Sequence, residues 1–393
     1  MEKNDMLEIK LKDAFELQMG KTPARSNLQY WDGSNKWISI SDIGKAKKFI
    51  SETKESISDL AVDECGIKIV PKGTVIMSFK LSIGKTAITA EDIYTNEAIM
   101  AFIDKKKYEI HTDYLYHYCK GTDWSAGSNK AVMGMTLNKA TLSEKCIRIP
   151  SIARQKSISR ELDKVDELIQ IKEKQVEEIE RLLKSRFTEM FGDTVINSMS
   201  WEEHRLDEYI EFLTSGSRGW SQYFVDTEKE LFITIKNVKN NHITLDNIQY
   251  VNAPANKEAE RTKVRAGDLL ISITADLGRT GVVDEKIASL GAYINQHLSL
   301  VRLDDKKINP QYVSYFLETE GGKIQFESKN QKGVKAGLNF DAIRSLKILV
   351  PPIERQNTYI EFVEQVEKAK AVIKEQLAEL ETLKKSLMQK YFG

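Results

Sequence analysis

The chain has 393 residues, with 58 lysine and arginine side chains against 58 aspartate and glutamate side chains, and its formal net charge is zero. At this length two or three domains are expected rather than one core. No window holds the roughly eighteen apolar residues of a membrane span, and the polar start MEKNDMLEIKLKD lacks a signal-peptide core. We therefore expect a cytoplasmic protein without membrane contact, with Cys65, Cys119 and Cys146 as reduced thiols.

Residues 1–147 are predicted to form a mixed α/β domain rich in β-strands. Runs of β-branched and apolar residues predict strands at 36–43 and 74–79, and a short helix is predicted at 114–118. Such a block is large enough to bury a core of its own.

Residues 148–192 are predicted to form one long helix. Between Ile158 and Met190 there is no glycine or proline, and Pro150 and Gly192 stand where a helix start and a helix end are marked. Lys172 and Arg186 fill two gaps in the apolar seam, whose three- and four-residue steps are those of a coiled coil. The seam residues are Ile158, Leu162, Val165, Ile169, Val176, Ile179, Leu183 and Met190.

The second half of the chain repeats the first. Residues 193–348 carry landmarks of the first block at offsets of 194 to 201 positions, and they predict strands at 231–238 and 269–274 and a helix at 312–317. Residues 349–393 repeat the long helix at an offset of 201, with Lys370 and Lys384 as its seam gaps. The repeated helix markers are Pro150, Arg154, Gln155, Phe191 and Gly192, which recur as Pro351, Arg355, Gln356, Phe392 and Gly393.

Chain connectivity predicts that the two long helices are antiparallel. A compact second block that starts near the end of the first helix must return the chain close to that end before the second helix begins. The narrow seam favours a coiled coil over the alternative that each helix covers its own domain, which needs a broader apolar face. The expected fold class is α+β: two pseudo-symmetric α/β, β-rich domains separated by an antiparallel coiled coil of two long helices.

These features resemble those of the specificity (S) subunits of type I restriction–modification systems over essentially the whole chain. The resemblance rests on duplicated motifs. The first half departs from the family pattern at two positions: it has Met6 where the second half has Trp201, and Ala153 where the second half has Glu354. The motifs are PSIARQ at 150–155, PPIERQ at 351–356, the helix ends LLKSRFTEMFG and TLKKSLMQKYFG, WEEHRLDEYIEF at 201–212 and KNQKGVKAGLN at 329–339.

The resemblance implies that residues 1–147 and 193–348 are target recognition domains, each reading one half of a bipartite target in double-stranded DNA. It implies that the helices at 148–192 and 349–393 set the spacer and dock two DNA adenine methyltransferase (M) subunits, with restriction (R) subunits completing the nuclease. The chain itself would be non-catalytic and bind no cofactor. S-adenosylmethionine, and ATP with Mg, would bind the partner subunits.

The residues themselves give no sign of an active site or a metal site. The Gly-Lys-Thr runs at 20–22 and 84–86 lack the earlier glycine of a phosphate loop, because Phe15 and Phe79 stand there. His111 and His117 are expected to be surface or core residues, since no second ligand stands at metal-binding spacing. Two alternatives remain open: a coiled-coil scaffold with two protein-binding globular heads, and an enzyme with an unrecognised site.

Candidate DNA contacts lie on loops that mix glycine, basic and polar residues, which can approach bases and phosphates closely. Each side chain could instead be a solvated loop charge, and Gly84 and Gly278 could serve tight turns. With zero net charge, we expect the isolated chain to bind DNA weakly and the methyltransferase subunits to neutralise most phosphates. The candidates are Lys21, Arg25, Lys85 and Lys130 in the first block, and Ser215, Arg218, Trp220, Arg279, Lys332 and Lys335 in the second.

Overall fold

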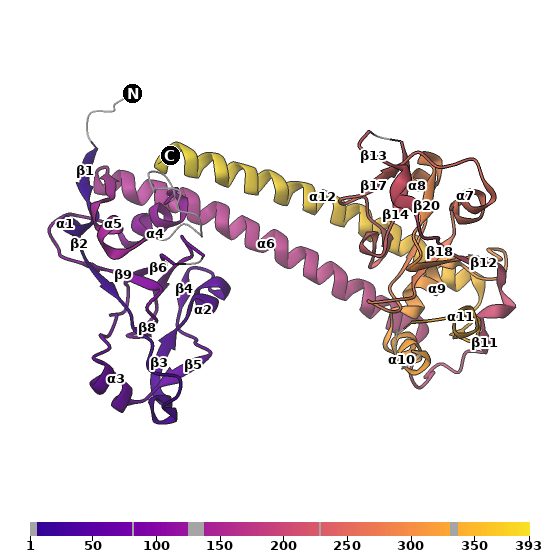
Figure 1. The fold of residues 1–393 in the computed structure, drawn as a ribbon, viewed down its shortest axis with the longest axis horizontal. Helices are drawn as coiled ribbons and strands as arrows, with labels where there is room; N and C mark the ends of the chain where they lie inside the picture. The colour runs from indigo at the N-terminus through magenta and orange to yellow at the C-terminus, as the bar shows by residue number, and fades with distance from the viewer. Residues whose placement is uncertain (1–5, 81, 125–136, 228, 331–336) are drawn as a thin grey trace. The chain divides into compact units, whose positions relative to one another are not determined.

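A computed structural model describes residues 6–80, 82–124, 137–227, 229–330 and 337–393. The chain divides into two compact units. Unit 1 comprises Met1–Lys174 and Lys374–Gly393, and unit 2 comprises Gln175–Ile373. Each unit therefore contains one globular head and a part of each long helix (Figure 1).

The head of unit 1 contains a five-stranded sheet and a smaller three-stranded sheet. The large sheet has the order β2 (Phe15–Met19), β9 (Ile99–Asp104), β6 (Val75–Ser78), β7 (Thr86–Thr89) and β4 (Phe49–Ile50). The small sheet has the order β5 (Glu55–Ile57), β3 (Trp31–Ile38) and β8 (Tyr94–Thr95), and β1 (Leu7–Lys10) pairs with β10 (Cys146–Ile149). The helices are α1 (Leu11–Ala14), η1 (Leu28–Tyr30), α2 (Ile40–Lys45), α3 (Asp59–Cys65), α4 (Thr112–Gly121) and α5 (Lys139–Glu144).

The head of unit 2 repeats this topology with one extra edge strand in each sheet, β15 and β13. Its large sheet has the order β12 (Ile210–Ser215), β21 (Leu298–Leu303), β18 (Leu269–Ser272), β19 (Thr280–Val282), β16 (Asn241–Ile243) and β15 (Val238–Lys239). The second sheet has the order β13 (Phe224–Val225), β17 (Gln249–Val251), β14 (Glu230–Ile233) and β20 (Ala292–Ile294), and β11 (Glu203–Arg205) pairs with β22 (Lys347–Leu349). The helices are η2 (Leu206–Glu208), η3 (Trp220–Tyr223), η4 (Ile235–Asn237), α7 (Lys257–Thr262), α8 (Glu285–Leu290), α9 (Pro310–Leu317), α10 (Glu320–Lys329) and α11 (Phe340–Arg344).

The shared topology extends to strand direction. In both large sheets the central pairs β6–β7 and β18–β19 are antiparallel, whereas the next pairs, β7–β4 and β19–β16, are parallel. One helix covers the same strands in each head, because α4 packs on β6 and β7 and α9 packs on β18 and β19. The two heads are therefore two versions of one fold, as the loose sequence repeat predicts.

The predicted strands at 36–43 and 231–238 are wrong in their second halves. Ser39 and Thr234 each begin a helical turn, α2 and η4, because a capping box joins Ser39 to Asp42 and Thr234 to Asn237. The side-chain oxygens of Asp42 and Asn237 accept hydrogen bonds from the backbone N–H groups and the hydroxyls of Ser39 and Thr234, so these N–H groups do not pair with a neighbouring strand. The same misreading in both halves shows that the break belongs to the shared fold.

The long helices are α6 (Ile152–Phe191) and α12 (Ile353–Phe392), each of 40 residues and hence about 60 Å long. Within unit 1, Asp166 of α6 forms an ion pair with Lys384 of α12. Within unit 2, Glu180 of α6 lies 3.2 Å from the amino group of Lys370, which is 6% exposed. Within unit 1, Tyr391 also donates to Glu161, and within unit 2, Tyr359 donates to the Leu183 carbonyl. In each unit the residue numbers of the contacts rise along α6 and fall along α12, so the helices are antiparallel, as predicted.

The start of each long helix is fixed by its repeated glutamine. Gln155 and Gln356 are fully buried, and their side-chain oxygens accept hydrogen bonds from the backbone N–H groups of His111 and Asn309 at 2.8 and 3.0 Å. Their amide groups donate back to the carbonyls of Pro150 and Pro351. A glutamine five residues after the proline therefore joins each helix to the loop before α4 or α9.

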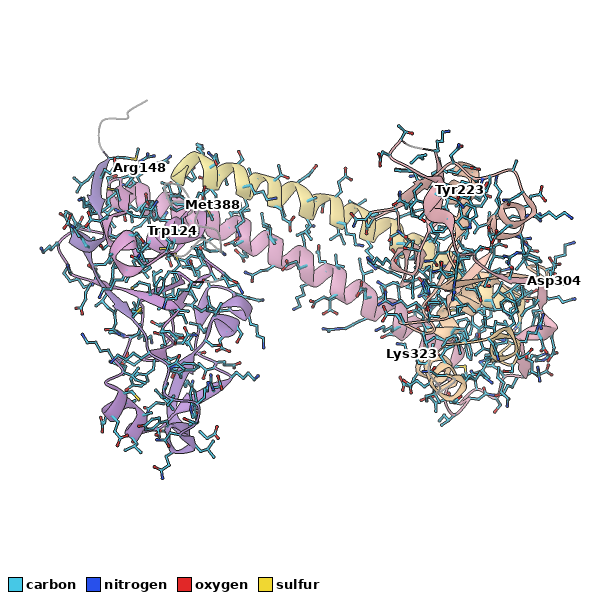
Figure 2. All side chains as sticks on the ribbon, in the orientation of Figure 1. Trp124, Arg148, Tyr223, Asp304, Lys323 and Met388 are labelled. Atoms are coloured by element: carbon cyan, nitrogen blue, oxygen red, sulfur yellow. The ribbon has the colours of Figure 1, made fainter. Side chains whose placement is uncertain are left out.

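The end of each long helix is fixed by its repeated phenylalanine. Phe191 is fully buried, with its ring centroid 4.9 Å from that of Tyr312 and 5.5 Å from that of Tyr359. Phe392 contacts Tyr114 and Tyr118 at 5.6 Å in the same way. In unit 1, Trp124 belongs to the buried cluster against which Met388 of α12 packs (Figure 2). The last turn of each helix is therefore part of a head's core.

Phe191→Ala is expected to lower the free energy of unfolding of unit 2 by about 3–5 kcal/mol, because it leaves a cavity among three aromatic rings. Denaturant unfolding followed by circular dichroism measures the change. Phe49→Ala is the matched control, since that ring is 59% exposed, and its cost should stay near or below about 1 kcal/mol. Equal costs for the two variants would contradict this role of Phe191.

Candidate nucleic-acid interface

The loops that carry the predicted contacts leave the first strand of each large sheet at a glycine. A Cβ atom on Gly20 would lie 2.1 Å from the carbonyl oxygen of Thr95, and one on Gly216 would lie 2.0 Å from that of Asn295. Neither position tolerates a side chain without a backbone shift. The loops at 20–25 and 215–220 therefore start from equivalent points in the two heads.

Lys21 and Arg25 are exposed, but both make contacts within their own head. The amino group of Lys21 donates a hydrogen bond of 2.8 Å to the carbonyl of Cys65, at the end of α3. Arg25 pairs with Glu55, and its guanidinium lies 3.8 Å from the ring centroid of Trp31. The hydrogen bond from Arg25 holds the pKa of Glu55 below its ordinary value, so the pair is charged at neutral pH. These side chains brace the loop, and contact with DNA remains a prediction for them.

The second loop class is a tight turn in both heads, which confirms that role for its glycines. Gly84 and Gly278 have φ angles of +90° and +79°. The N–H groups of Lys85 and Arg279 donate to the hydroxyls of Ser78 and Ser272 at 3.1 and 2.9 Å. The same hydrogen-bonded turn therefore presents a cationic side chain at the same point of each sheet.

The two cations of these turns differ in their surroundings. Lys85 is exposed, and its chain passes over Gly44, where an added Cβ would lie 3.0 Å from its amino group. Arg279 is 41% exposed and forms an ion pair of 2.9 Å with Asp276. Both remain accessible to a ligand of the opposite charge.

The loop at 215–220 separates into an exposed part and a buried part. Arg218 is exposed, and its side chain has no hydrogen bond or ion pair with any residue that the structure describes. Trp220 is 4% exposed, with its ring centroid 5.2 Å from that of Phe232 and 5.0 Å from that of Tyr293. Trp220 is therefore a core residue of the head, and we leave it out of the proposed contact set.

Arg261 of α7 holds this loop in place, although it is not among the residues predicted from the sequence. Its guanidinium donates to the Thr214 hydroxyl, to the Ser215 carbonyl at 2.8 Å and to the Ser217 hydroxyl at 2.9 Å. In unit 1 the donor of the corresponding contact lies on the loop, because Lys21 donates to the Cys65 carbonyl at the end of α3. An arginine in a short polar helix has no local signal that would reveal its partner 44 to 47 positions away.

Lys130, Lys332 and Lys335 lie outside the described residues. The segments that follow them are equivalent, because Asn138 and Asn339 cap α5 and α11 through their side chains. Across the described ranges, no group of three or more histidine, cysteine, aspartate or glutamate side chains could hold a metal ion. No helix in those ranges is long and apolar enough to cross a membrane.

Comparisons with known proteins agree with the duplicated architecture. The chain is 27% identical over 268 residues to the type I restriction enzyme MjaIX specificity subunit of Methanocaldococcus jannaschii, which covers 63% of this chain and 61% of that protein. The chain thus spans about three fifths of the length of that relative.

Two solved structures share the fold over nearly the full length of each chain. One comes from work on the complex assembly and conformational transition of the type I R-M system, with a TM-score of 0.62, 17% identity and coverage of 99% of this chain and 98% of that one. The other is the S subunit of a type I restriction–modification system from M. genitalium, with a TM-score of 0.57, 13% identity and coverage of 100% and 98%.

The family model matches the chain twice, once in each half. The model is that of the type I restriction modification DNA specificity domain, and it matches residues 3–181 and 199–382. Each match contains one head together with most of the long helix that follows it. The chain therefore belongs to the type I restriction modification DNA specificity family, with two copies of its domain.

Proposed function

We propose that the chain is the DNA-specificity subunit of a type I restriction–modification complex. Each head reads one half of a bipartite target in double-stranded DNA, and the paired helices set the spacer between the halves. The observation that carries this proposal is the presence of two heads of one topology with different loops, joined by antiparallel helices. Similar scaffolds with different loops suit two readers of different sequences, because base identity is read by side chains while phosphate contacts only position the protein.

The partners that we propose are two methyltransferase subunits docked on the helices, joined by restriction subunits in the full complex. Support comes from large apolar side chains that the helices leave exposed. Leu168, Ile171 and Leu182 of α6 are 38%, 45% and 48% exposed, and Val372 and Leu383 of α12 are 53% and 46% exposed. A docked partner would remove these apolar side chains from water, which favours association.

In this proposal the chain is non-catalytic and acts in the cytoplasm. S-adenosylmethionine, and ATP with Mg, would bind the methyltransferase and restriction subunits. The alternative of a scaffold with protein-binding heads is not favoured, because both halves match a DNA-specificity family. With a net charge of zero, the chain relies on its partners for most phosphate neutralisation.

A gel-shift titration of the full chain, with and without its methyltransferase partner, tests the proposal. We expect the chain alone to bind DNA only at about micromolar concentrations, and the complex to bind its target at about 10⁻⁸ M or below. A nanomolar complex of the isolated chain would contradict the role given to the partner. Equal affinity of the complete complex for target and unrelated DNA would contradict the function itself.

Arg218→Ala is expected to weaken binding of the target by the methyltransferase complex by about tenfold to a hundredfold, because it removes the exposed cation of a reading loop. Arg205→Ala is the matched control, since Arg205 belongs to the same head, is 57% exposed and pairs with Asp207 outside the candidate loops. The same gel shift measures both variants. Unchanged affinity for Arg218→Ala would remove this side chain from the interface.

A further inference from the structure

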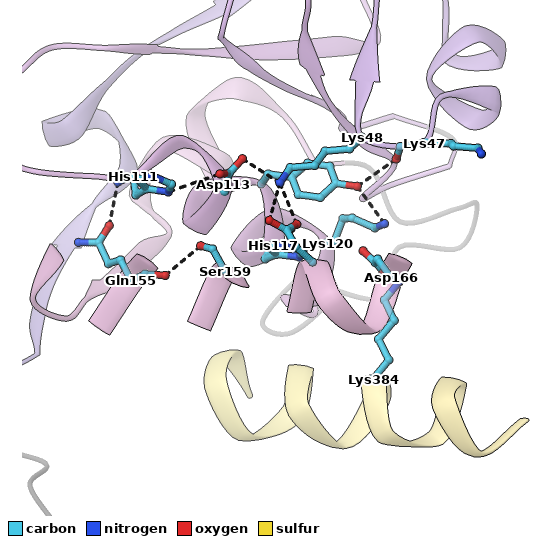
Figure 3. A network of polar contacts seen from close by, with 12 residues as sticks. Lys47, Lys48, His111, Asp113, His117, Lys120, Gln155, Ser159, Asp166 and Lys384 are labelled. Carbon is cyan, nitrogen blue, oxygen red and sulfur yellow. Dashed lines mark hydrogen bonds and ion pairs between the residues drawn. The ribbon is translucent and has the colours of Figure 1, made fainter. Parts of the chain in front are cut away.

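A half-buried charge cluster joins the head of unit 1 to α6. The segment before the edge strand β4 is held from two sides, because the Tyr116 hydroxyl donates to the Lys47 carbonyl at 3.1 Å and the Ile88 N–H donates to the Lys48 carbonyl at 2.8 Å. This fixed backbone directs the Lys48 side chain toward α4 and α6 (Figure 3).

Lys48 bridges two carboxylates from different elements. Its amino group lies 2.8 Å from both carboxylate oxygens of Asp163 on α6, and 2.9 Å from a carboxylate oxygen of Asp113 on α4. The side chain of Lys48 is 22% exposed, so this contact is largely screened from water. The edge of the sheet, the covering helix and the long helix therefore meet at one ammonium group.

His117 of α4 is the fourth residue of the cluster. It is fully buried on α4, and its Nε2 lies 2.8 Å from Asp163, while its Nδ1 has no hydrogen-bond partner among the described residues. Burial acts to raise the pKa of Asp163, but hydrogen bonds from His117 and Lys48 hold that pKa below its ordinary value. Asp163 is thus an ionised carboxylate that receives donors from two elements of the head.

The same face of α6 also receives the second long helix. Asp166, one turn after Asp163, pairs with Lys384 of α12. Apolar contacts through Ile158, Leu162 and Val165 bind the head to α6, but such contacts have little directionality. Charge-assisted hydrogen bonds are directional, and a charge left unpaired there is costly, so the cluster selects one orientation of the head on the helix.

The second head is fastened at the corresponding place by different residues. In unit 2 the corresponding strand β16, which lies next to the edge strand β15, carries Asn241, whose side-chain oxygen accepts a hydrogen bond of 3.1 Å from Ser314 of α9, and His242, whose Nε2 lies 3.8 Å from Glu367 of α12. Each head is therefore joined to a long helix near the outer strands of its large sheet. In unit 2 a lysine shared by two carboxylates lies on the long helix itself, because Lys370 of α12 contacts Glu367 and Glu180, whereas in unit 1 the shared lysine, Lys48, belongs to the head.

We propose that Lys48, Asp113, His117 and Asp163 are positioning residues that fix the first head on α6 and thereby determine how strictly the spacer length is read. The inference rests on the proposed function, in which the two half-sites are read at a fixed separation. A reading loop displaced by about 3.4 Å lies over the neighbouring base pair. A head that rocks on α6 would accept targets with one base pair more or less, while its contacts to the bases stay the same.

The test replaces the chromosomal copy in the source organism with the full-length double variant Lys48→Met/Asp163→Asn, and maps DNA methylation by single-molecule sequencing. We expect the same two half-sites as in the unaltered strain, with methylation spread to spacers one base pair shorter and longer. The preference for the native spacer should fall by about tenfold, the scale set by one charge-assisted hydrogen bond. The matched control is Lys36→Met/Glu91→Gln, an ion pair of the same head whose side chains are 44% and 43% exposed, which should keep the native spacer alone.

The inference is overturned if the double variant methylates only targets with the native spacer, whether the fraction of methylated sites is unchanged or reduced. If the double variant does not accumulate, His117→Gln, which keeps a donor for Asp163 but changes its geometry, is judged by the same criterion. Methylation mapping of the unaltered strain separates this outcome from failure of the proposed function. If the proposed function is wrong, that strain has no bipartite methylation motif that depends on this chain.

Discussion

Removing one heptad from both long helices is expected to shorten the spacer of the recognised target by about three base pairs and to leave both half-sites unchanged. Seven residues shorten an α-helix by about 10 Å, and one base pair spans about 3.4 Å. Seven residues also make almost two full helical turns, so the flanking residues keep their facing sides.

The ion pairs between the helices define which heptads to remove. The pairs Asp166–Lys384 and Glu180–Lys370 are 14 positions apart on both helices (180 − 166 and 384 − 370), so deleting residues 172–178 of α6 together with residues 372–378 of α12 shortens both intervals equally. Deleting both segments keeps both pairs and the apolar seam. Deleting residues 172–178 alone is the control, since it puts the two pairs out of register and should abolish recognition. Methylation mapping that finds the original spacer in the double deletion would show that the helices do not set it.

Exchanging residues 1–147 for the first domain of another family member is expected to change one half-site completely and to leave the other half-site as it is. The two heads have separate cores, so the second keeps its loops when the first is replaced. Methylation mapping of the hybrid gives both half-sites in one measurement. A change in both half-sites would contradict independent reading by the heads.

The exchange replaces residues of the head that contact α6, while their partners on α6 stay in place. Gln155 stays in the hybrid and binds the Glu109 carbonyl of the native head, so the incoming head must offer a carbonyl at that place. Asp163 also stays, whereas Lys48 and His117 leave with the head. A hybrid with looser spacer selection, corrected by restoring a lysine and a histidine at those positions, would agree with the role proposed for the cluster.

The long helices and their direction could be predicted from the sequence because their signals are local and duplicated. The heptad seam, the prolines before Gln155 and Gln356 and the terminal Phe-Gly pairs each lie within a few residues of the feature they mark. The chain connection then left one direction for the second helix. The same locality misled the strand prediction, because apolar β-branched residues outweighed the capping boxes at Ser39 and Thr234.

The candidate interface could be predicted only as a set of loops. Loop composition shows that Lys21 and Arg25 are polar and accessible, but their partners Cys65 and Glu55 are distant in sequence. Trp220 lies in a loop whose composition predicts DNA contact, but its ring packs on Phe232 and Tyr293 in the core of the head. Side-chain roles in such loops follow from tertiary contacts, and these carry no periodic signal along the chain.

The central claim is that one chain reads two half-sites at a fixed separation. Single-molecule sequencing of the source organism's DNA, with the gene intact and with it deleted, measures this most directly. We predict adenine methylation at one bipartite motif with a single spacer length, and its complete loss on deletion. A methylation pattern that is unchanged by the deletion, or a motif that depends on the gene but is one uninterrupted sequence, would contradict the account.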